Sequence, residues 1–314
     1  MTAHGNNPSP FPQELGIHVF QRGWLSSNST LIRGSDHNAL VDSGYHCHSA
    51  QMVELVDKVL GDSPLQLLLN THLHSDHCGG NAALQRRYPG LQTAIPPGMA
   101  EAVAEWDTEV LTYGPTGQEC EPFGFDRLLE PGDSLQLGDA MWEIHGAKGH
   151  DPHSIVLFQR THGILVSADA LWENGFGVVF PELEGEDAFH EVAQTLDIIE
   201  RLGPRIVIPG HGAVFTDVAA ALARARSRLD QFIEHPERHL RHALKVLLKF
   251  RLLAWRQIAL VDLERWAIDT PYLSRHMPEP GCITDANRQW LQSLIGELER
   301  AGVAATIDGY LVDR

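Results

Sequence analysis

The sequence predicts an α/β protein in which two groups of strands form a sheet sandwich with helices on its outside. Strand-like and helix-like segments are mixed along the first two thirds of the 314-residue chain, and the strand-like segments fall into two groups. The last third reads as nearly all helix. Mixed order of this kind is typical of layered α/β domains, and 43% apolar residues are enough for a substantial core.

In the first group, short apolar runs broken by Gly, Ser and Asn predict strands, and "LQLLLN" predicts a buried one. Apolar residues at helical spacing, closed by Gly or by Pro-Gly, predict helices between them. The expected strands lie at residues 16–24, 29–34, 37–44, 65–70 and 90–96, and the expected helices at 49–61, 79–90 and 98–106.

The second group follows residues 107–126, whose glycines, prolines and weak periodicity indicate a loop insertion. Successive strands are expected within 133–147, 154–160 and 163–170. A strongly amphipathic helix over 186–203 and a strand with its exit loop over 204–212 complete this group.

After residue 215 the pattern predicts four helices, at 218–235, 236–257, 260–269 and 284–302. A short strand-like end with a turn at Gly309 follows, so the tail is expected to be winged-helix-like. The predicted organisation is a flexible N-terminal arm (1–16), a catalytic domain (17–225) and a helical, winged-helix-like C-terminal domain (226–314).

The segment "NTHLHSDHCGG", residues 70–80, places three histidines and an aspartate within six positions. Buried polar groups without partners are costly, so this segment is either a solvated loop or a binding site. His72 and His74 can point the same way on one segment, and Asp76 and His77 follow on the next bend. Imidazole and carboxylate suit zinc, iron or manganese, so the segment predicts ligands for two neighbouring cations.

Three further candidate ligands follow expected strands: His150 in "KGHDPHS", Asp169 after "ILVSA" and His211 in "PGHG". Loops that leave one edge of a sheet bring distant residues together. Each of these residues alone would read as a structural polar group, but with the first cluster they predict a seven-ligand site for two metal ions.

The segments "THLHSDH", "GHDPHS", "SADA" and "PGHG", in this order, resemble the metallo-β-lactamase superfamily over roughly residues 17–215. The resemblance implies an αββα sandwich with a dinuclear site at its edge. It also implies a division of the ligands: His72, His74 and His150 for one ion, Asp76, His77 and His211 for the other, and Asp169 as the bridge. The tail is similar to the subgroup with a winged-helix-like C-terminus, which includes hydrolases and some RNA-cutting members.

Such a site implies a hydrolase that uses a metal-bridging hydroxide. Two divalent ions, most simply zinc with iron or manganese as alternatives, can deprotonate a shared water near neutral pH. Asp76 or Asp169 would orient the hydroxide and accept its proton. No Ser or Cys nucleophile is required, and the sequence holds neither a G-x-S-x-G elbow nor a P-loop.

The segment "ALWENGFGVVFPELEG" follows Asp169 and is expected to line the pocket through Trp172, Phe176 and Phe180; the alternative is that these rings only pack. An apolar pocket favours an ester, thioester or lactone. His153 in "HDPHS" departs from the small residues of many relatives and is either a pocket group or an ordinary loop histidine.

Two other functions remain open. Residues 238–256 are rich in Lys and Arg and contain no acid. This would suit an RNA- or phosphodiester-cleaving enzyme, or a helix whose basic face lies against the acidic body or solvent. An iron-dependent sulfur dioxygenase or a non-catalytic regulator is the third option, which the complete ligand set disfavours.

Charge and cysteine usage limit the partners and the compartment. The formal charge is −17, and residues 1–225 carry 11 Lys and Arg against 29 Asp and Glu, which disfavours nucleic acid and anionic membranes. The four cysteines form no CxxC pair, which indicates a reducing, cytoplasmic location. The expected partner is a small-molecule substrate, without a membrane or a signal peptide, and a homodimer is compatible with the sequence.

Overall fold

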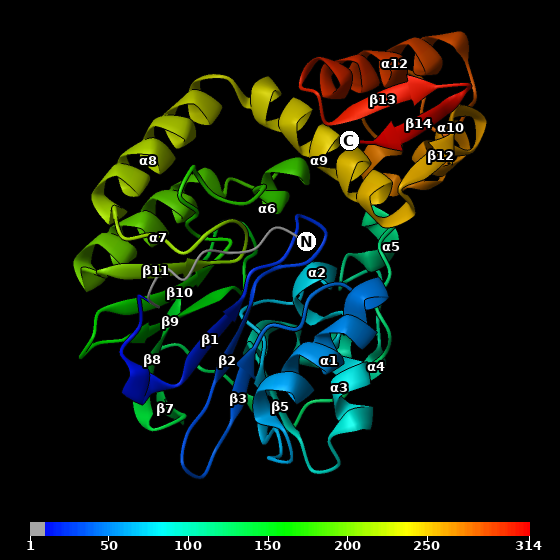
Figure 1. Ribbon diagram of the computed structural model, residues 1–314. Coiled ribbons are helices and arrows are strands. Elements are labelled where there is room, and N and C mark those ends of the chain that lie inside the picture. Colours follow the sequence, from blue (N-terminus) through cyan, green and yellow to red (C-terminus); the bar gives the residue numbers. More distant parts are fainter. Residues whose placement is uncertain (1–9) are drawn as a thin grey trace.

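Two β-sheets lie face to face and enclose the central core of the protein. The computed structural model describes residues 10–314 (Figure 1). The first sheet has the order β1-β2-β3-β4-β5-β6 and the second β11-β10-β9-β8-β7. Their strands are β1 (Ile17–Phe20), β2 (Ser29–Ile32), β3 (Ala39–Val41), β4 (Leu67–Leu69), β5 (Gln92–Ile95), β6 (Arg127–Leu128), β7 (Ser134–Leu137), β8 (Ala140–Gly146), β9 (Ile155–Gln159), β10 (Ile164–Ala168) and β11 (Ile206–Pro209).

Helices cover the outer face of each sheet. The apolar residues of α1 and α3 pack on the first sheet, and those of α7 and α8 on the second. Because β9 and β10 are buried along their whole length, they read as continuous apolar runs rather than alternating ones. The predicted αββα sandwich is confirmed. Its longer helices are α1 (Ser49–Leu60), α3 (Asn81–Arg87), α4 (Ala100–Glu105), α7 (Phe189–Leu202) and α8 (Val218–Glu234).

Short helical turns lie in the connections. Of these, α2 follows β4, and α5 lies within the predicted loop insertion 107–126. The short elements are η1 (Gln13–Leu15), η2 (His46–His48), α2 (Ser75–Cys78), η3 (Pro97–Met99), α5 (Tyr113–Thr116) and α6 (Phe180–Leu183).

The C-terminal region is helical, as predicted, and ends in a small antiparallel sheet of order β12-β14-β13. Leu248, Leu294 and Leu311 belong to its own apolar core. A turn at Gly309 joins the last two strands, and the closer winged-helix likeness stays a prediction. The elements are α9 (Pro236–Trp255), β12 (Gln257–Ala259), α10 (Leu260–Asp269), α11 (Pro271–Ser274), α12 (Asp285–Arg300), β13 (Ala304–Ile307) and β14 (Tyr310–Asp313).

Two predicted boundaries need correction. The limit at residues 225/226 falls inside α8, and Leu229 and Phe232 beyond it are buried in the core of the sandwich. The expected flexible arm, 1–16, lies partly outside the described residues, and from Phe11 onward the chain is packed instead. Phe11 and Leu15 are buried against the core between the sheets, because both are apolar and precede the edge strand β1.

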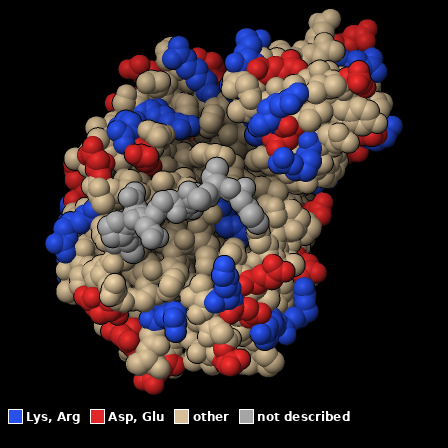
Figure 2. All heavy atoms as spheres, in the orientation of Figure 1, with Lys and Arg blue, Asp and Glu red and all other residues tan. Residues whose placement is uncertain are grey.

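The basic stretch 238–256 is helix α9, and its charges are largely paired within the protein. Arg241 Nη2 and Lys245 Nζ lie 2.8 and 2.7 Å from the carboxylate oxygens of Glu297. Lys249 pairs with Asp313 in the same way. On the face shown in Figure 2, blue and red side chains lie next to one another over this region. These acids belong to the C-terminal region rather than to the acidic body of residues 1–225. A helix whose basic residues are paired nevertheless describes α9 better than a phosphate-binding face does.

None of the described helices is apolar over a long enough stretch to cross a bilayer.

Candidate metal centre

The seven predicted ligands come together at one edge of the sandwich. His72, His74, Asp76 and His77 follow β4, and the other three follow β8, β10 and β11. In the first sheet β3, β4 and β5 run parallel, so the segments after them leave the same edge. The parallel pairing of β10 with β11 does the same for Asp169 and His211 in the second sheet.

The ligand atoms form three overlapping groups, in each of which they lie within 4.8 Å of one another. The groups are His72, His74 and His150; His72, His77 and Asp169; and Asp76, His77 and His211. Asp169 lies between the histidines: Oδ1 is 3.4 Å from His77 Nε2, and Oδ2 is 3.4 Å from His150 Nε2. The predicted cluster is thus assembled in space, with one carboxylate facing histidines of both ends.

Two buried nitrogens at the centre of the cluster lack a well-formed hydrogen bond within residues 10–314. They are the fully enclosed Nε2 atoms of His72 and His77, and Asp169 Oδ1 approaches the second of them only to 3.4 Å. An unpaired polar atom of this kind costs about 1–3 kcal/mol, so folded proteins rarely retain one without a reason. Imidazole nitrogens converging with carboxylate oxygens are the donor set that zinc, iron and manganese accept. The residues therefore fit divalent metal ions.

Asp42 orients this cluster from behind. Its Oδ2 lies 2.8 Å from His77 Nδ1 and accepts a hydrogen bond from Thr71 Oγ1 at 2.8 Å, while its Oδ1 accepts one from the Thr71 N–H. With Nδ1 engaged by the carboxylate, the Nε2 of His77 is left for the metal side. In another member of the cluster, His150 Nδ1 lies 2.5 Å from the carbonyl oxygen of Val178 and is engaged in the same way.

The electrostatics of the cluster suit a cation. Burial holds the pKa of His72 well below its usual range, helped by the neighbouring His77, so that its imidazole is neutral. Burial alone would raise the pKa of Asp169, but His77 and His211 hold it well below its usual range. Burial lowers the pKa of His77, but Asp42, Asp169 and Asp76 outweigh this and raise it, so metal binding at His77 would release a proton. Neutral imidazoles and ionised carboxylates are the forms that bind metal.

Sequence comparison agrees with this geometry. The sequence profile described as the Metallo-beta-lactamase superfamily matches residues 22–211, which is more than half of the chain. The chain belongs to the metallo-beta-lactamase superfamily. The matched residues include all seven members of the cluster and end on His211.

Relatives within the superfamily are named for different activities. "Acyl-coenzyme A thioesterase MBLAC2" of Gallus gallus is 27% identical over 222 residues, covering 65% of this chain and 80% of the relative. "Hydroxyacylglutathione hydrolase" of Yersinia enterocolitica is 28% identical over 168 residues, covering 53% and 54%. The crystal structure of a beta-lactamase domain protein from Burkholderia ambifaria aligns with a TM-score of 0.60 over 97% of this chain and 94% of that one. At 20% identity this last likeness shows the fold alone.

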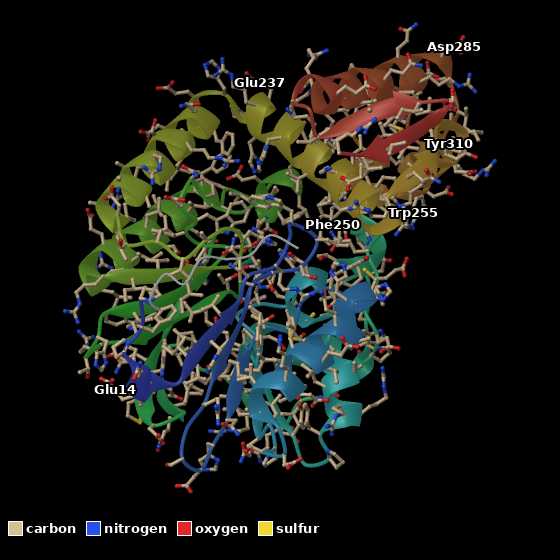
Figure 3. The ribbon with its side chains drawn as sticks, in the orientation of Figure 1. Glu14, Glu237, Phe250, Trp255, Asp285 and Tyr310 are labelled. Atoms are coloured by element: carbon tan, nitrogen blue, oxygen red, sulfur yellow. The ribbon has the colours of Figure 1, made fainter. Side chains whose placement is uncertain are left out.

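The cluster opens into a cavity of about 350 Å³, a usual size for a small-molecule site. Trp172 and Phe180 line it, as predicted, and the insertion contributes Gln118. One wall comes from α9, where Phe250 lies on the side of the helix that faces the sandwich (Figure 3). The C-terminal region therefore completes the pocket.

Two predicted pocket residues lie elsewhere. Phe176 is 2% exposed and packs against Phe232 in the core of the second sheet, because its ring points away from the cavity that Phe180 lines. His153 is also absent from the lining. Its ring lies against Gly98, where an added Cβ would come within 2.0 Å of Nδ1. This supports the interpretation of an ordinary loop histidine.

Trp24 is a pocket residue that the sequence analysis missed. It is 60% exposed, and its ring stacks on His211 with centroids 5.4 Å apart. It also meets Trp172 edge to face at 5.5 Å. The sequence signal that could have found it is a single Trp in the polar segment "QRGWLSSN", where the pattern predicts no core position. Cys78 is buried, and its thiol lies 3.1 Å from Tyr113 Oη.

Gly210 is required by the close approach of Asp169. An added Cβ would lie 2.1 Å from Asp169 Oδ1 and 3.1 Å from His77 Cε1. We expect Gly210→Ala to displace the carboxylate, reduce bound metal and lower kcat/KM by about 100-fold, as ångström-scale misplacement does. Metal analysis and steady-state kinetics check this. Gly124→Ala, where a Cβ meets nothing within 4 Å, is the control and should behave as wild type.

Proposed function

We propose that this chain is a metal-dependent hydrolase that cleaves a small acyl substrate, with a thioester favoured over an ester or a lactone. The observation that carries the proposal is the pair of buried Nε2 atoms of His72 and His77, which make no hydrogen bond to any described residue and lie close to Asp169 in the wall of the cavity. The names of two relatives support the substrate class, since one is an acyl-coenzyme A thioesterase and the other a hydroxyacylglutathione hydrolase.

The ligand roles follow the three groups in the cluster. His72, His74 and His150 would hold one ion, Asp76, His77 and His211 the other, and Asp169 would contact both. Zinc suits this set best, with iron or manganese as alternatives. When bound, such ions lower the pKa of a shared water to near 7 and polarise the acyl oxygen.

The chain's own groups then position the reaction and move its protons. Asp76 Oδ2 lies 3.0 Å from His211 Nε2 and lines the cavity, so it is placed to accept a proton from the attacking water. Trp172 Nε1 donates a hydrogen bond to Asp169 Oδ1 at 3.2 Å and fixes the orientation of that carboxylate. Around them, Phe180, Val178 and Phe250 give the acyl group an apolar wall that excludes water.

The test is a substrate panel for the metal-loaded protein, containing acyl thioesters, carboxylic esters, lactones, phosphodiesters and short RNA. We expect thioesters to be turned over fastest and His74→Ala to abolish that turnover. His190→Ala removes an exposed histidine outside the cavity and should keep it. Full activity of His74→Ala would contradict the assignment, and oxygen uptake with a persulfide by iron-loaded protein would point to a dioxygenase instead.

The charges of α9 decide how well the alternative function, RNA cleavage, is supported. Because Arg241, Lys245 and Lys249 are already paired with acids, few cations remain for a phosphate backbone. We expect short single-stranded RNA to bind more weakly than about 10⁻⁴ M even at low salt. Fluorescence anisotropy at several salt concentrations checks this, and tight binding that falls steeply with salt would favour the ribonuclease.

A further inference from the structure

Arg228 is a cation in the wall of the cavity. It lies on α8, and its side chain passes Gly175, where an added Cβ would come within 2.8 Å of Nη1. The guanidinium carbon lies 5.7 Å from the ring centroid of Phe176 and 5.3 Å from that of Phe232. Two aromatic faces and a glycine thus hold the group in place within the wall.

No carboxylate neutralises Arg228. Within residues 10–314 no ion pair involves it, although the chain has 41 acids against 24 Lys and Arg. Its protein partners are the carbonyl oxygen of Asn174, 3.5 Å from Nη1, and His242 Nε2, 2.7 Å from Nη2. Glu173 also lines the cavity, but it contacts the neighbouring Arg224 through its backbone carbonyl rather than Arg228 through its carboxylate.

The environment leaves the positive charge uncompensated. Burial lowers the pKa of Arg228, and no neighbouring carboxylate in the described part of the chain counters this effect. Burial and the same guanidinium lower the pKa of His242 to about 3, so this imidazole is neutral and accepts a hydrogen bond from Arg228. A partly buried guanidinium with only neutral partners is costly in isolation, and an anion that enters the cavity would remove that cost.

We propose that Arg228, supported by His242, binds a carboxylate group of the substrate, so that the substrate is an anionic acyl compound rather than a neutral one. This inference rests on the proposed function only for which bond of the substrate is cleaved. The guanidinium fork matches a carboxylate in shape, and Arg228 lines the same cavity as Asp76 and Asp169, so one small molecule is placed to reach both.

The kinetic test compares matched pairs of thioesters on the metal-loaded protein. One pair carries the charge on the acyl side: a glutaryl thioester of N-acetylcysteamine against its terminal amide. The other carries it on the thiol side: an acetyl thioester of 3-mercaptopropionate against that of 3-mercaptopropanamide. We expect the charged member of one pair to have a kcat/KM about 10- to 100-fold higher, the worth of a charge-assisted hydrogen bond. The pair that shows it identifies the side.

Variants assign the preference to Arg228. Arg228→Gln should bring the ratio of charged over neutral substrate to about one, mostly through KM, and Arg228→Lys should restore part of it. Arg226→Gln, on the same helix but paired with Asp197 and Glu200 outside the cavity, removes the same charge and should keep the full ratio. No preference in either pair, or a preference that survives Arg228→Gln, would overturn the proposal.

His242→Glu tests the same point without removing the cation. The introduced carboxylate would pair with Arg228, stabilise the local charge and compete with the substrate anion. We expect this variant to fold and to lose the preference. Retention of the preference would contradict the role of Arg228 even if Arg228→Gln could not be purified in folded form.

A binding measurement separates this proposal from the proposed function. Calorimetry of metal-loaded protein with 4-phenylbutyrate and with 4-phenylbutanamide requires no turnover. We expect the carboxylate to bind about tenfold more tightly, and Arg228→Gln to remove the difference while Arg226→Gln keeps it. If no thioester is hydrolysed but this difference holds, only the reaction is wrong. If thioesters are hydrolysed without any charge dependence, only the anion site is wrong.

Discussion

Asp169→Ala is expected to lower kcat/KM by at least about 100-fold. The loss of a residue that only hydrogen-bonds to a metal ligand already costs up to about 100-fold in activity. The carboxylate is the one group in the cluster that faces His77 at one end and His150 at the other, each at 3.4 Å. Without it the two halves lose the carboxylate that lies between them.

Metal content and fold are measured alongside the kinetics of Asp169→Ala. We expect fewer bound ions per chain and an unchanged far-ultraviolet circular dichroism spectrum, since Asp169 belongs to the site rather than to the cores described above. Asp187→Ala is the matched control, because this aspartate is 88% exposed and pairs only with His190. Wild-type turnover by Asp169→Ala with unchanged metal content would show that Asp169 does not belong to the site.

Asp42→Ala is expected to weaken both the fold and the metal site. Its loss leaves the buried His77 Nδ1 and the Thr71 N–H without their acceptor. In addition, residue 42 has φ of 59°, a left-handed conformation that aspartate and asparagine tolerate better than alanine. We expect the free energy of unfolding to fall by about 2–5 kcal/mol and metal affinity to fall by about 10- to 100-fold.

Asp42→Asn separates these effects, because asparagine retains an acceptor oxygen and suits the left-handed conformation. Chemical denaturation should show most of the stability restored, while metal titration should still show weakened binding, since the charge that orients His77 is missing. Equal metal affinity of wild type, Asp42→Asn and Asp42→Ala would show that Asp42 has no role behind His77.

The sequence allowed the cluster of seven residues to be predicted because its members are dense and linked to strands. Four of the seven lie within residues 72–77, and each of the others lies within four residues of the end of a strand. Strand periodicity and the order of segments were therefore enough to place them at one edge. The αββα layers followed from the same pattern, since fully buried strands and amphipathic helices leave clear apolar signals.

Other features depended on tertiary contacts that no local pattern encodes. Asp42 follows the buried strand β3 at the same edge as the histidines, a signal that was available, but its positive φ and its bond to His77 are visible only in the structure. Phe176 and Phe180 are four residues apart in an irregular segment, so nothing local tells which ring faces the cavity. The end of the sandwich was misplaced because α8 is one continuous helix across residue 225.

The most direct test of the central claim is the metal content of the purified wild-type chain, measured by inductively coupled plasma mass spectrometry without exposure to chelators. The account predicts about two divalent ions per chain, mainly zinc, and their removal by a chelator together with all thioesterase activity. A chain that contains no such ion and still hydrolyses thioesters at full rate would contradict it.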